Sequence, residues 1–300
     1  MLYVRPDFYD EFRCLADACR HSCCVGWEIE VDEESLAYYR KIDGELGREL
    51  RESIALTPTP HFRLAEGERC PFLRGDGLCR LILALGEDSL CDICALHPRF
   101  YNDYPGREEA GLGLCCEEAA RLLTAGEGHL RLVAWSDGEA EPEPTPLLRL
   151  RDEIFAILVD DALSLTERMR RGMERLDRPL APFHADEAAR FFLTLERMDS
   201  AWTALLKKLA TGGEAAPEPR LSALRYARVA EYLVYRHFAA AETQEAAAGR
   251  LQFCFYAVRL IAALEAYSGE ALRLFSAEIE YSDENVEKAC AWLEKDGGTF

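Results

Sequence analysis

Hydrophobic residues in the second half of the chain recur at three- and four-residue intervals. Between them stand arginine and acidic side chains, and the first such run comprises Leu147, Leu150, Ile154, Ile157, Leu158 and Leu165. This spacing places the apolar side chains on one face of a helix. The same pattern, rich in good helix formers, predicts further helices near residues 184–210, 221–241, 246–267 and 284–295.

Aromatic residues follow the same helical spacing in this half. They could line a cofactor pocket, but large apolar side chains at helical intervals more often form a core. We therefore expect core packing for Phe191, Phe192, Trp202, Tyr226, Tyr232, Tyr235, Phe253, Phe255 and Tyr256.

The first half has shorter and less regular patterns. Residues Trp27–Val31 alternate like a short strand, and Asp32 is placed to cap a helix that begins after it. The sequence Gly-Asp-Gly at Gly75–Gly77 predicts a turn. Cys116–Leu123 predicts a helix, because its acidic residues fall in the first turn, where the helix dipole favours them.

Two stretches interrupt these patterns. Residues Ser136–Pro146 alternate acidic residues with prolines, which predicts an extended linker or surface loop, and Thr211–Arg220 predicts a loop between helices. The expected division is thus a cysteine-rich domain over residues 1–135, a linker over 136–146 and a helical domain over 147–300. The expected fold is mostly α, with a small metal-stapled N-terminal domain containing little strand, packed on an all-α bundle.

The charge of the chain argues against nucleic-acid binding. It carries 35 basic and 54 acidic residues, a formal net charge of -19. Such a charge repels phosphate backbones and attracts a cationic partner, such as a lysine-rich surface or a sulfonium cofactor. Acidic side chains on solvated helix faces are the simpler explanation.

The twelve cysteines indicate metal or redox chemistry. The N-terminus is charged where a signal peptide would be apolar, and no membrane-spanning apolar run is present, so we expect a cytoplasmic protein that does not bind membranes. Structural disulfides are rare in that reducing compartment. Ten of the twelve cysteines lie between Cys14 and Cys116.

These ten cysteines form three clusters along the sequence. The first is Cys14-x4-Cys19-x3-Cys23-Cys24. The second runs through Cys70, Cys79 and Cys91-x2-Cys94, and the third is the pair Cys115-Cys116. Short loops between thiols let several sulfurs converge on one metal, and a Cys-x2-Cys turn occurs in both zinc and iron–sulfur sites. Three clusters within about a hundred residues predict a metal centre.

The number and kind of metals stay open at this stage. Four thiolates suffice for a tetrahedral zinc or a four-iron cluster, so ten exceed one site. Adjacent side chains point in different directions, so Cys23 and Cys24 serve different atoms of one cluster or two different centres. The uneven spacing favours an iron–sulfur cluster slightly over zinc. For the isolated Cys254 and Cys290 we expect simple burial in the helical half.

Other chemical motifs are sparse. His97, three residues after Cys94, is a candidate ligand or proton carrier, and His21 is a weaker one. The three-cysteine motif of radical enzymes is absent, as are dinucleotide and phosphate-binding loops. Nothing in the sequence identifies a catalytic base or a cofactor pocket.

The cysteine motifs resemble a known family. The segments FRCLADACRHSCCVGWEIEVD, CPFLRGDGLC, LCDICALHPRF and CCEEAARLL, within residues 1–125, are similar to those of the flagellin lysine-N-methylase family and to zinc- or iron-chelating cysteine-cluster domains. The helical remainder is compatible with that family but unspecific.

This resemblance implies a bacterial enzyme that transfers methyl groups from S-adenosylmethionine to lysine side chains of flagellin, with a 4Fe-4S cluster and with zinc as a further candidate metal. Cys116 is preferred to Cys115 because it opens the CEEAARLL segment. The ligand set implied by the family comprises Cys14, Cys19, Cys23, Cys24, Cys70, Cys79, Cys91, Cys94 and Cys116.

Three functions are thus compatible with the sequence. The leading one is a protein-lysine methyltransferase whose cluster either binds the cofactor or only staples the domain. The second is a non-catalytic protein that binds or delivers zinc or iron through exposed thiols. The third is a redox sensor that uses Cys23 and Cys24, which would require exposed thiols of low pKa.

Overall fold

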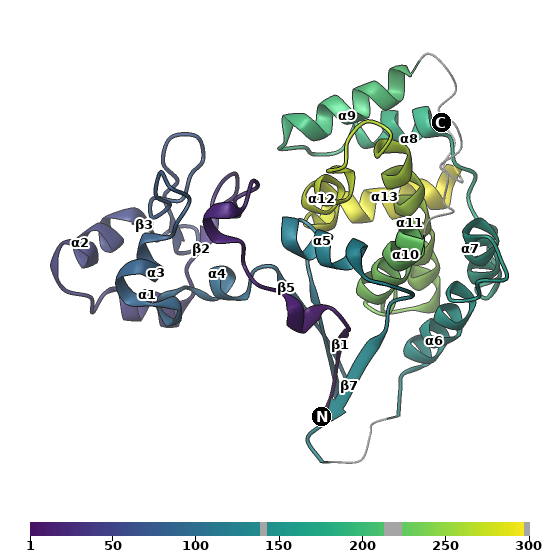
Figure 1. Cartoon of the computed structure of the whole chain (residues 1–300), viewed down its shortest axis with the longest axis horizontal. Coiled ribbons are helices and arrows are strands. Elements are labelled where there is room, and N and C mark those ends of the chain that lie inside the picture. The colour runs from purple at the N-terminus through teal and green to yellow at the C-terminus, as the bar shows by residue number, and fades with distance from the viewer. Residues whose placement is uncertain (139–142, 213–223, 297–300) are drawn as a thin grey trace. The chain divides into compact units, whose positions relative to one another are not determined.

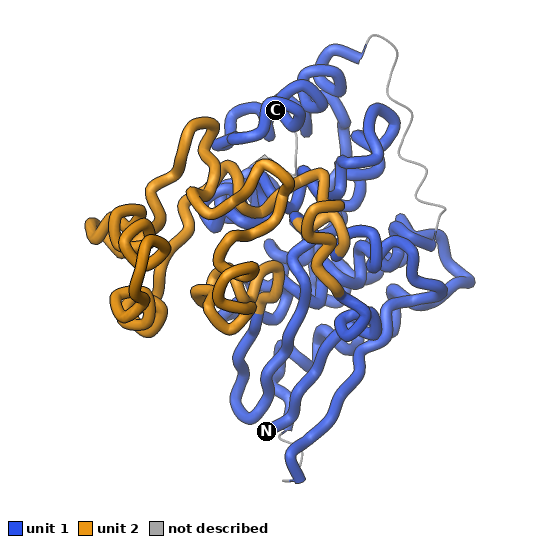
Figure 2. Tube along the Cα trace, turned by 60° about the vertical axis from the view of Figure 1, so that its left-hand side comes forward, with its two compact units in different colours: residues 1–12, 101–115, 119–300 blue, residues 13–100, 116–118 orange. Residues whose placement is uncertain are grey.

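The chain forms two compact units in the computed structural model, which describes residues 1–138, 143–212 and 224–296 (Figure 1). The cysteine unit comprises residues 13–100 and 116–118, and the helical unit comprises residues 1–12, 101–115 and 119–300. Figure 2 distinguishes the two units by colour. This division differs from the boundary expected at residues 136–146.

The boundary differs because a four-stranded sheet joins residues from the start of the chain to the helical unit. Strand β1 (Leu2–Pro6) pairs in parallel with β6 (Arg107–Leu112) and antiparallel with β7 (Leu132–Ser136), and β5 (Arg99–Tyr104) completes the order β5-β6-β1-β7 (Figure 1). All four strands lie within residues 2–136, so the N-terminal part of the chain contains more strand than expected, whereas the described part of residues 147–300 forms only helices, as expected. Strands of five or six residues are too short for their alternation to be recognised, and their pairing partners lie far away in the sequence.

Helices make up the rest of the helical unit. They are α5 (Glu117–Ala125, which begins in the cysteine unit), α6 (Pro146–Leu158), α7 (Leu165–Glu174), α8 (Ala185–Phe192), α9 (Ser200–Thr211), α10 (Leu224–His237), α11 (Gln244–Leu264), α12 (Ala271–Phe275), a π-helix (Ser276–Glu280) and α13 (Asp283–Asp296). The predicted helical segments are confirmed, except that 184–210 contains two helices. Residues 139–142 and 213–220 of the two predicted loops lie outside the described residues, as do residues 221–223 of the predicted helix 221–241.

Buried aromatic residues join helix α10 to the sheet. The Tyr235 hydroxyl donates towards the carbonyl oxygens of Val4 and Ala110, at 3.1 and 2.9 Å, and the Tyr232 hydroxyl lies 2.6 Å from the carbonyl oxygen of Leu112. The expected core packing of the aromatic stripes is confirmed, since only Tyr226 among them is not buried. Cys254 is also buried, as expected.

A fully buried ion pair anchors α6 to strand β6. The two terminal guanidinium nitrogens of Arg151, Nη1 and Nη2, each donate to one carboxylate oxygen of Glu109 at 2.6 Å, and neither side chain is exposed. The Arg107 Nε donates to the same carboxylate at 2.7 Å. Because Glu109 compensates two arginines, its loss would leave charge uncompensated in the interior.

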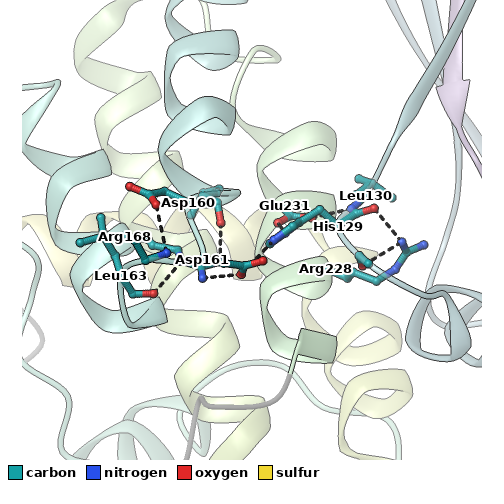
Figure 3. Close-up of polar contacts among 11 residues, drawn as sticks. His129, Leu130, Asp160, Asp161, Leu163, Arg168, Arg228 and Glu231 are labelled. Atoms are coloured by element: carbon teal, nitrogen blue, oxygen red, sulfur yellow. Dashed lines mark hydrogen bonds and ion pairs between the residues drawn. The ribbon is translucent and has the colours of Figure 1, made fainter.

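A second polar network fastens the loops around α10 (Figure 3). His129 lies between two carboxylates: its Nδ1 is 2.5 Å from Glu231 and its Nε2 is 3.2 Å from Asp161. Arg168 on α7 pairs with Asp161 at 2.7 Å, and Arg228 on α10 donates to the carbonyl of His129 at 3.0 Å. These contacts hold the loops before β7 and before α7 on the helices.

Helix α11 is the central helix of this unit. It is long and apolar enough to pass a composition test for a membrane span, but 89% of its most apolar window is buried inside the protein. That burial is expected of a core helix. Among the described residues no other helix passes the test.

The cysteine unit contains short elements. They are a 3-10 helix (Ala16–Ala18), β2 (Ile29–Glu30), α1 (Glu33–Tyr39), α2 (Gly44–Ser53), β3 (Ile54–Ala55), β4 (His61–Phe62), α3 (Arg80–Leu85), a second 3-10 helix (Glu87–Ser89) and α4 (Asp92–Leu96). The strands form a sheet in the order β2-β4-β3. The strand predicted over Trp27–Val31 is thus reduced to two residues, while the helices predicted after Asp32 and at Cys116 are confirmed.

Asp32 links two of these helices. Its Oδ1 accepts the backbone N–H of Ser35 in the first turn of α1, and its Oδ2 accepts the N–H of Asp92 at the start of α4, at 2.8 and 2.9 Å. Burial alone would raise the pKa of Asp32, but these hydrogen bonds outweigh burial and lower it. One carboxylate therefore caps α1, as predicted, and also fixes the segment that contains Cys91.

Replacing Asp32 with alanine should destabilise the cysteine unit by about 1 to 2 kcal/mol at neutral pH, because an N-cap is lost. Since the native pKa lies below the ordinary 3.8, the stabilisation is present above 3.8 and disappears as the pH falls through the native pKa. Denaturant unfolding of the wild type and of the Asp32→Ala variant, at neutral and at acidic pH, measures the difference between their free energies of unfolding. Asp43→Ala is the matched control, because Asp43 precedes α2 without a side-chain cap hydrogen bond. An equal effect of both variants would contradict the assignment.

Replacing Glu109 with glutamine should destabilise the helical unit by about 3 to 5 kcal/mol, because the buried Arg151 and the half-buried Arg107 lose their counter-charge. The exposed Asp186–Arg190 pair provides a control, and Asp186→Asn should cost less than about 1 kcal/mol. Thermal unfolding followed by circular dichroism compares the two variants. A Glu109→Gln protein as stable as the control would show that the buried pair contributes little.

Candidate metal centre

All nine cysteines of the predicted ligand set lie in the cysteine unit. Cys116 belongs to it through residues 116–118, whereas Cys115, Cys254 and Cys290 lie in the helical unit. The nine differ in exposure: Cys70 and Cys91 are buried, Cys14 and Cys23 are exposed, and the other five are half-buried. The choice of Cys116 over Cys115 is thus compatible with the division of the chain.

Five of these cysteines pack on one hydrophobic core, and we call them the inner cysteines: Cys24, Cys70, Cys79, Cys91 and Cys94. Phe62 and Phe72 form the centre of that core, with ring centroids 5.2 Å apart. Tyr39 closes it by donating its hydroxyl to the carbonyl of Ser89 at 2.8 Å.

Backbone hydrogen bonds bring the inner cysteines together from distant segments. The Cys70 N–H donates to the carbonyl of Cys24 at 2.8 Å, which joins the first cysteine cluster to the second. Cys79 pairs with Leu73 across the turn predicted at Gly75–Gly77. In the Cys-x2-Cys segment the Cys94 N–H donates to the carbonyl of Cys91 at 2.9 Å.

The inner sulfurs also influence one another electrostatically. A hydrogen bond from the Cys94 thiol lowers the pKa of Cys91, and the same bond together with burial raises the pKa of Cys94. Burial raises the pKa of Cys70 to about 12, with further contributions from Cys24 and Cys79. A soft metal cation would displace these protons, because metals bind cysteine as the thiolate.

The remaining four, which we call the outer cysteines, are Cys14, Cys19, Cys23 and Cys116. Arg20 holds the Cys116 segment near the first cluster: its Nε and its backbone N–H donate to the two carboxylate oxygens of Glu117, at 2.9 and 3.1 Å. The contact between Arg20 and Glu117 was not predicted from the sequence. The available signal was that these two residues of opposite charge stand directly beside two cysteine clusters.

A glycine turn packs against the outer segment. Gly77 has a φ of +84°, and a Cβ at this position would stand 3.3 Å from the α-carbon of Asp17. Glycine is therefore required both by the left-handed backbone and by the close approach. The turn places the chain between Cys70 and Cys79 beside the 3-10 helix that separates Cys14 from Cys19.

The donor set suits a thiophilic metal, although the sulfurs are not gathered around one point. Among the described residues, no group of three or more histidine, cysteine or acidic side chains is arranged to hold a metal ion. Nine thiols in a unit of this size are nevertheless the donors that zinc and iron–sulfur clusters take. The metal-stapled domain stays a prediction.

The two histidine candidates lie in the cysteine unit. Burial lowers the pKa of His97 to about 4, so its ring is neutral at physiological pH. The centroid of that ring is 6.1 Å from the Trp27 ring centroid. His21 offers its backbone carbonyl to the Cys19 thiol at 3.4 Å.

Two hollows lie away from the cysteines. One, of about 410 Å³ in the cysteine unit, is lined by Glu45, Leu46, Arg74, Arg80, Leu83 and Ala84. The other, of about 450 Å³ in the helical unit, lies between α7, residues 179–183 and Arg259. Both fall in the size range of ligand pockets, and both combine apolar walls with charged side chains.

Comparison with known proteins reveals relatives named for lysine methylation and for flagellar biosynthesis. Proteins named Lysine-N-methylase from Salmonella typhimurium and Salmonella choleraesuis are each 25% identical over 221 residues, which cover 70% of this chain and 54% of theirs. The flagellar biosynthetic protein FliU of Salmonella muenchen is 29% identical over 128 residues, 40% of this chain and 76% of its own length.

The chain thus spans about half the length of the two lysine-N-methylases it matches. No family model and no solved structure matches it. The three relatives nevertheless show that the chain is homologous to the lysine-N-methylases. They confirm the resemblance to the flagellin lysine-N-methylase family that its cysteine motifs indicated.

Proposed function

We propose that this chain is a cytoplasmic protein-lysine N-methyltransferase that transfers a methyl group from S-adenosylmethionine to lysine side chains of flagellin. The observation that carries the proposal is the similarity to proteins named Lysine-N-methylase over 70% of the chain. The flagellar name of the FliU relative supports flagellin as the acceptor. The net charge of -19 supports a lysine-bearing partner rather than a nucleic acid.

The reaction sets two requirements for the protein. The lysine nitrogen attacks the methyl carbon as the carbon–sulfur bond breaks, so the amine must be neutral, although its free pKa is about 10.4. A proton leaves the nitrogen, and S-adenosylhomocysteine is released. Donor, carbon and leaving sulfur must also be in line, so positioning contributes much of the rate. An acidic entrance would attract the ammonium, and a desolvated interior would then favour the neutral amine.

We further propose that the inner cysteines hold an iron–sulfur cluster. Cys24, Cys70, Cys91 and Cys94 are the best candidates, because each packs on the core and each influences another of the four electrostatically. When bound, the cluster would take one thiolate on each iron and would cross-link three distant segments of the chain. The residues themselves exclude water from the sulfurs, because Cys70 and Cys91 are buried.

Replacing Cys91 with serine should lower iron and sulfide content, and methyl transfer to flagellin, by at least about 10-fold each, because a ligand with little solvent access is lost. Anaerobic purification, metal and sulfide analysis, and transfer of labelled methyl from S-adenosylmethionine measure these quantities. Cys254→Ser is the control, since Cys254 is buried in the helical unit.

Bound metal without any methyl transfer to flagellin would contradict the enzyme proposal and favour a metal-handling protein. Zinc in place of iron, with no sulfide and no visible absorption, would contradict the cluster proposal. If methyl transfer persists after complete removal of iron, the enzyme proposal stands and the cluster has no role in the reaction.

A further inference from the structure

His129 joins two loops of the helical unit through both nitrogens of its ring (Figure 3). Its Nδ1 lies 2.5 Å from Glu231 on α10, and its Nε2 lies 3.2 Å from Asp161. The histidine stands in the loop between α5 and β7, residues 126–131, and Asp161 stands in the loop between α6 and α7, residues 159–164. One imidazole ring therefore connects a helix with two loops that are distant in the sequence.

These two contacts set the number of protons that the arrangement needs. An ionised carboxylate only accepts hydrogen bonds, and a neutral imidazole has one N–H donor. Two protons are therefore required, one on Nε2 facing Asp161 and one between Nδ1 and Glu231. A neutral histidine and an ionised glutamate supply only one. The arrangement thus requires an additional proton on the His129–Glu231 pair, whichever of the two residues carries it.

The two carboxylates differ in how they keep their charge. Arg168 on α7 donates to the same oxygen of Asp161 at 2.7 Å, and the hydrogen bonds from Arg168 and His129 lower the pKa of Asp161. Burial raises the pKa of Glu231, although the Leu130 N–H donates to its second oxygen at 2.7 Å. Asp161 therefore stays ionised, and the additional proton belongs to the buried pair.

Other charges surround the pair from the neighbouring segments. Arg228 on α10 donates to the carbonyl oxygens of Gly128 and His129, at 3.3 and 3.0 Å. Further charged side chains around these contacts are Asp7, Arg131 and Asp160. Histidine is the side chain that ordinarily gains or loses a proton between pH 5 and 8. The His129–Glu231 pair is therefore where the charge of this network changes near neutral pH.

We propose that His129 is a proton-dependent latch, which holds the loop before β7 to the loop before α7 when the His129–Glu231 pair carries the additional proton and releases it when that proton is lost. The single N–H then left on the ring can serve one carboxylate. Glu231 keeps it, because its side chain is fully buried and a buried acceptor without a donor is costly. Asp161 is 73% exposed, so water replaces the contact it loses.

Release separates the two loops without unfolding either of them. Arg168 still pairs with Asp161 and still donates to the carbonyl oxygens of Leu158 and Leu163, at 2.8 and 3.0 Å. Arg228 still holds the carbonyl of His129. The released loop leads into α7, which forms one wall of the larger hollow. The latch does not depend on the proposed function.

Thermal unfolding of the full chain at pH 5.5 and pH 8.5 tests the latch. The folded chain binds the additional proton more tightly than the unfolded chain, so the stabilisation is present at low pH and is lost as the pH rises. The unfolding midpoint of the wild type should therefore exceed that of His129→Gln by about 1 to 3 °C more at pH 5.5 than at pH 8.5.

Asp161→Asn gives a second test that keeps the histidine. An amide can donate as well as accept, so it contacts the ring in either protonation state, and the pH-dependent part of the difference should disappear. His184→Gln is the matched control, because His184 is exposed before α8 and makes no side-chain cap hydrogen bond. Its midpoint should change with pH as the wild type does. A pH dependence in Asp161→Asn equal to that of the wild type would overturn the proposal, as would an equal loss of it in His184→Gln.

Discussion

The hydrogen bond between the Cys70 N–H and the Cys24 carbonyl is the contact on which the cysteine unit depends. It brings two cysteine segments to one core, in which sulfur atoms pack beside Phe62 and Phe72. A unit of this size buries a limited apolar area, so its core alone provides a small margin of stability. Metal ligation at the inner cysteines would add cross-links between the segments that this core joins, and it would thereby stabilise the unit.

The helical unit is stabilised in a different way from the cysteine unit. Its stability comes from long helices, above all α11, and from buried polar contacts that fix how α6 and α10 meet the sheet. A bidentate pair such as Arg151–Glu109 is directional, so it specifies one arrangement more strongly than apolar packing does. The methyl transfer that we propose would require such rigidity, because in-line transfer tolerates little displacement of the reacting groups.

Much of the fold could be predicted from local patterns. Helical periodicity identified α6, α10, α11 and α13 and predicted α8 and α9 as one segment, but it identified neither α7 nor α12. The position of Asp32 identified an N-cap. The four-stranded sheet could not be predicted, because β1 is stabilised as a strand only by pairing with segments more than a hundred residues away in the sequence. The second bond of Asp32, to Asp92, was missed for the same reason.

For the candidate site, the sequence by itself determined the chemistry: the number of cysteines, their spacing and their family resemblance all indicate a thiolate metal site. Only the tertiary structure decided which thiols share surroundings: it brings Cys24 and Cys70 to one core and places Cys115 and Cys116 in different units. The physical reason is that side-chain chemistry belongs to each residue. Proximity, burial and pKa depend instead on which distant segments the folded backbone brings together.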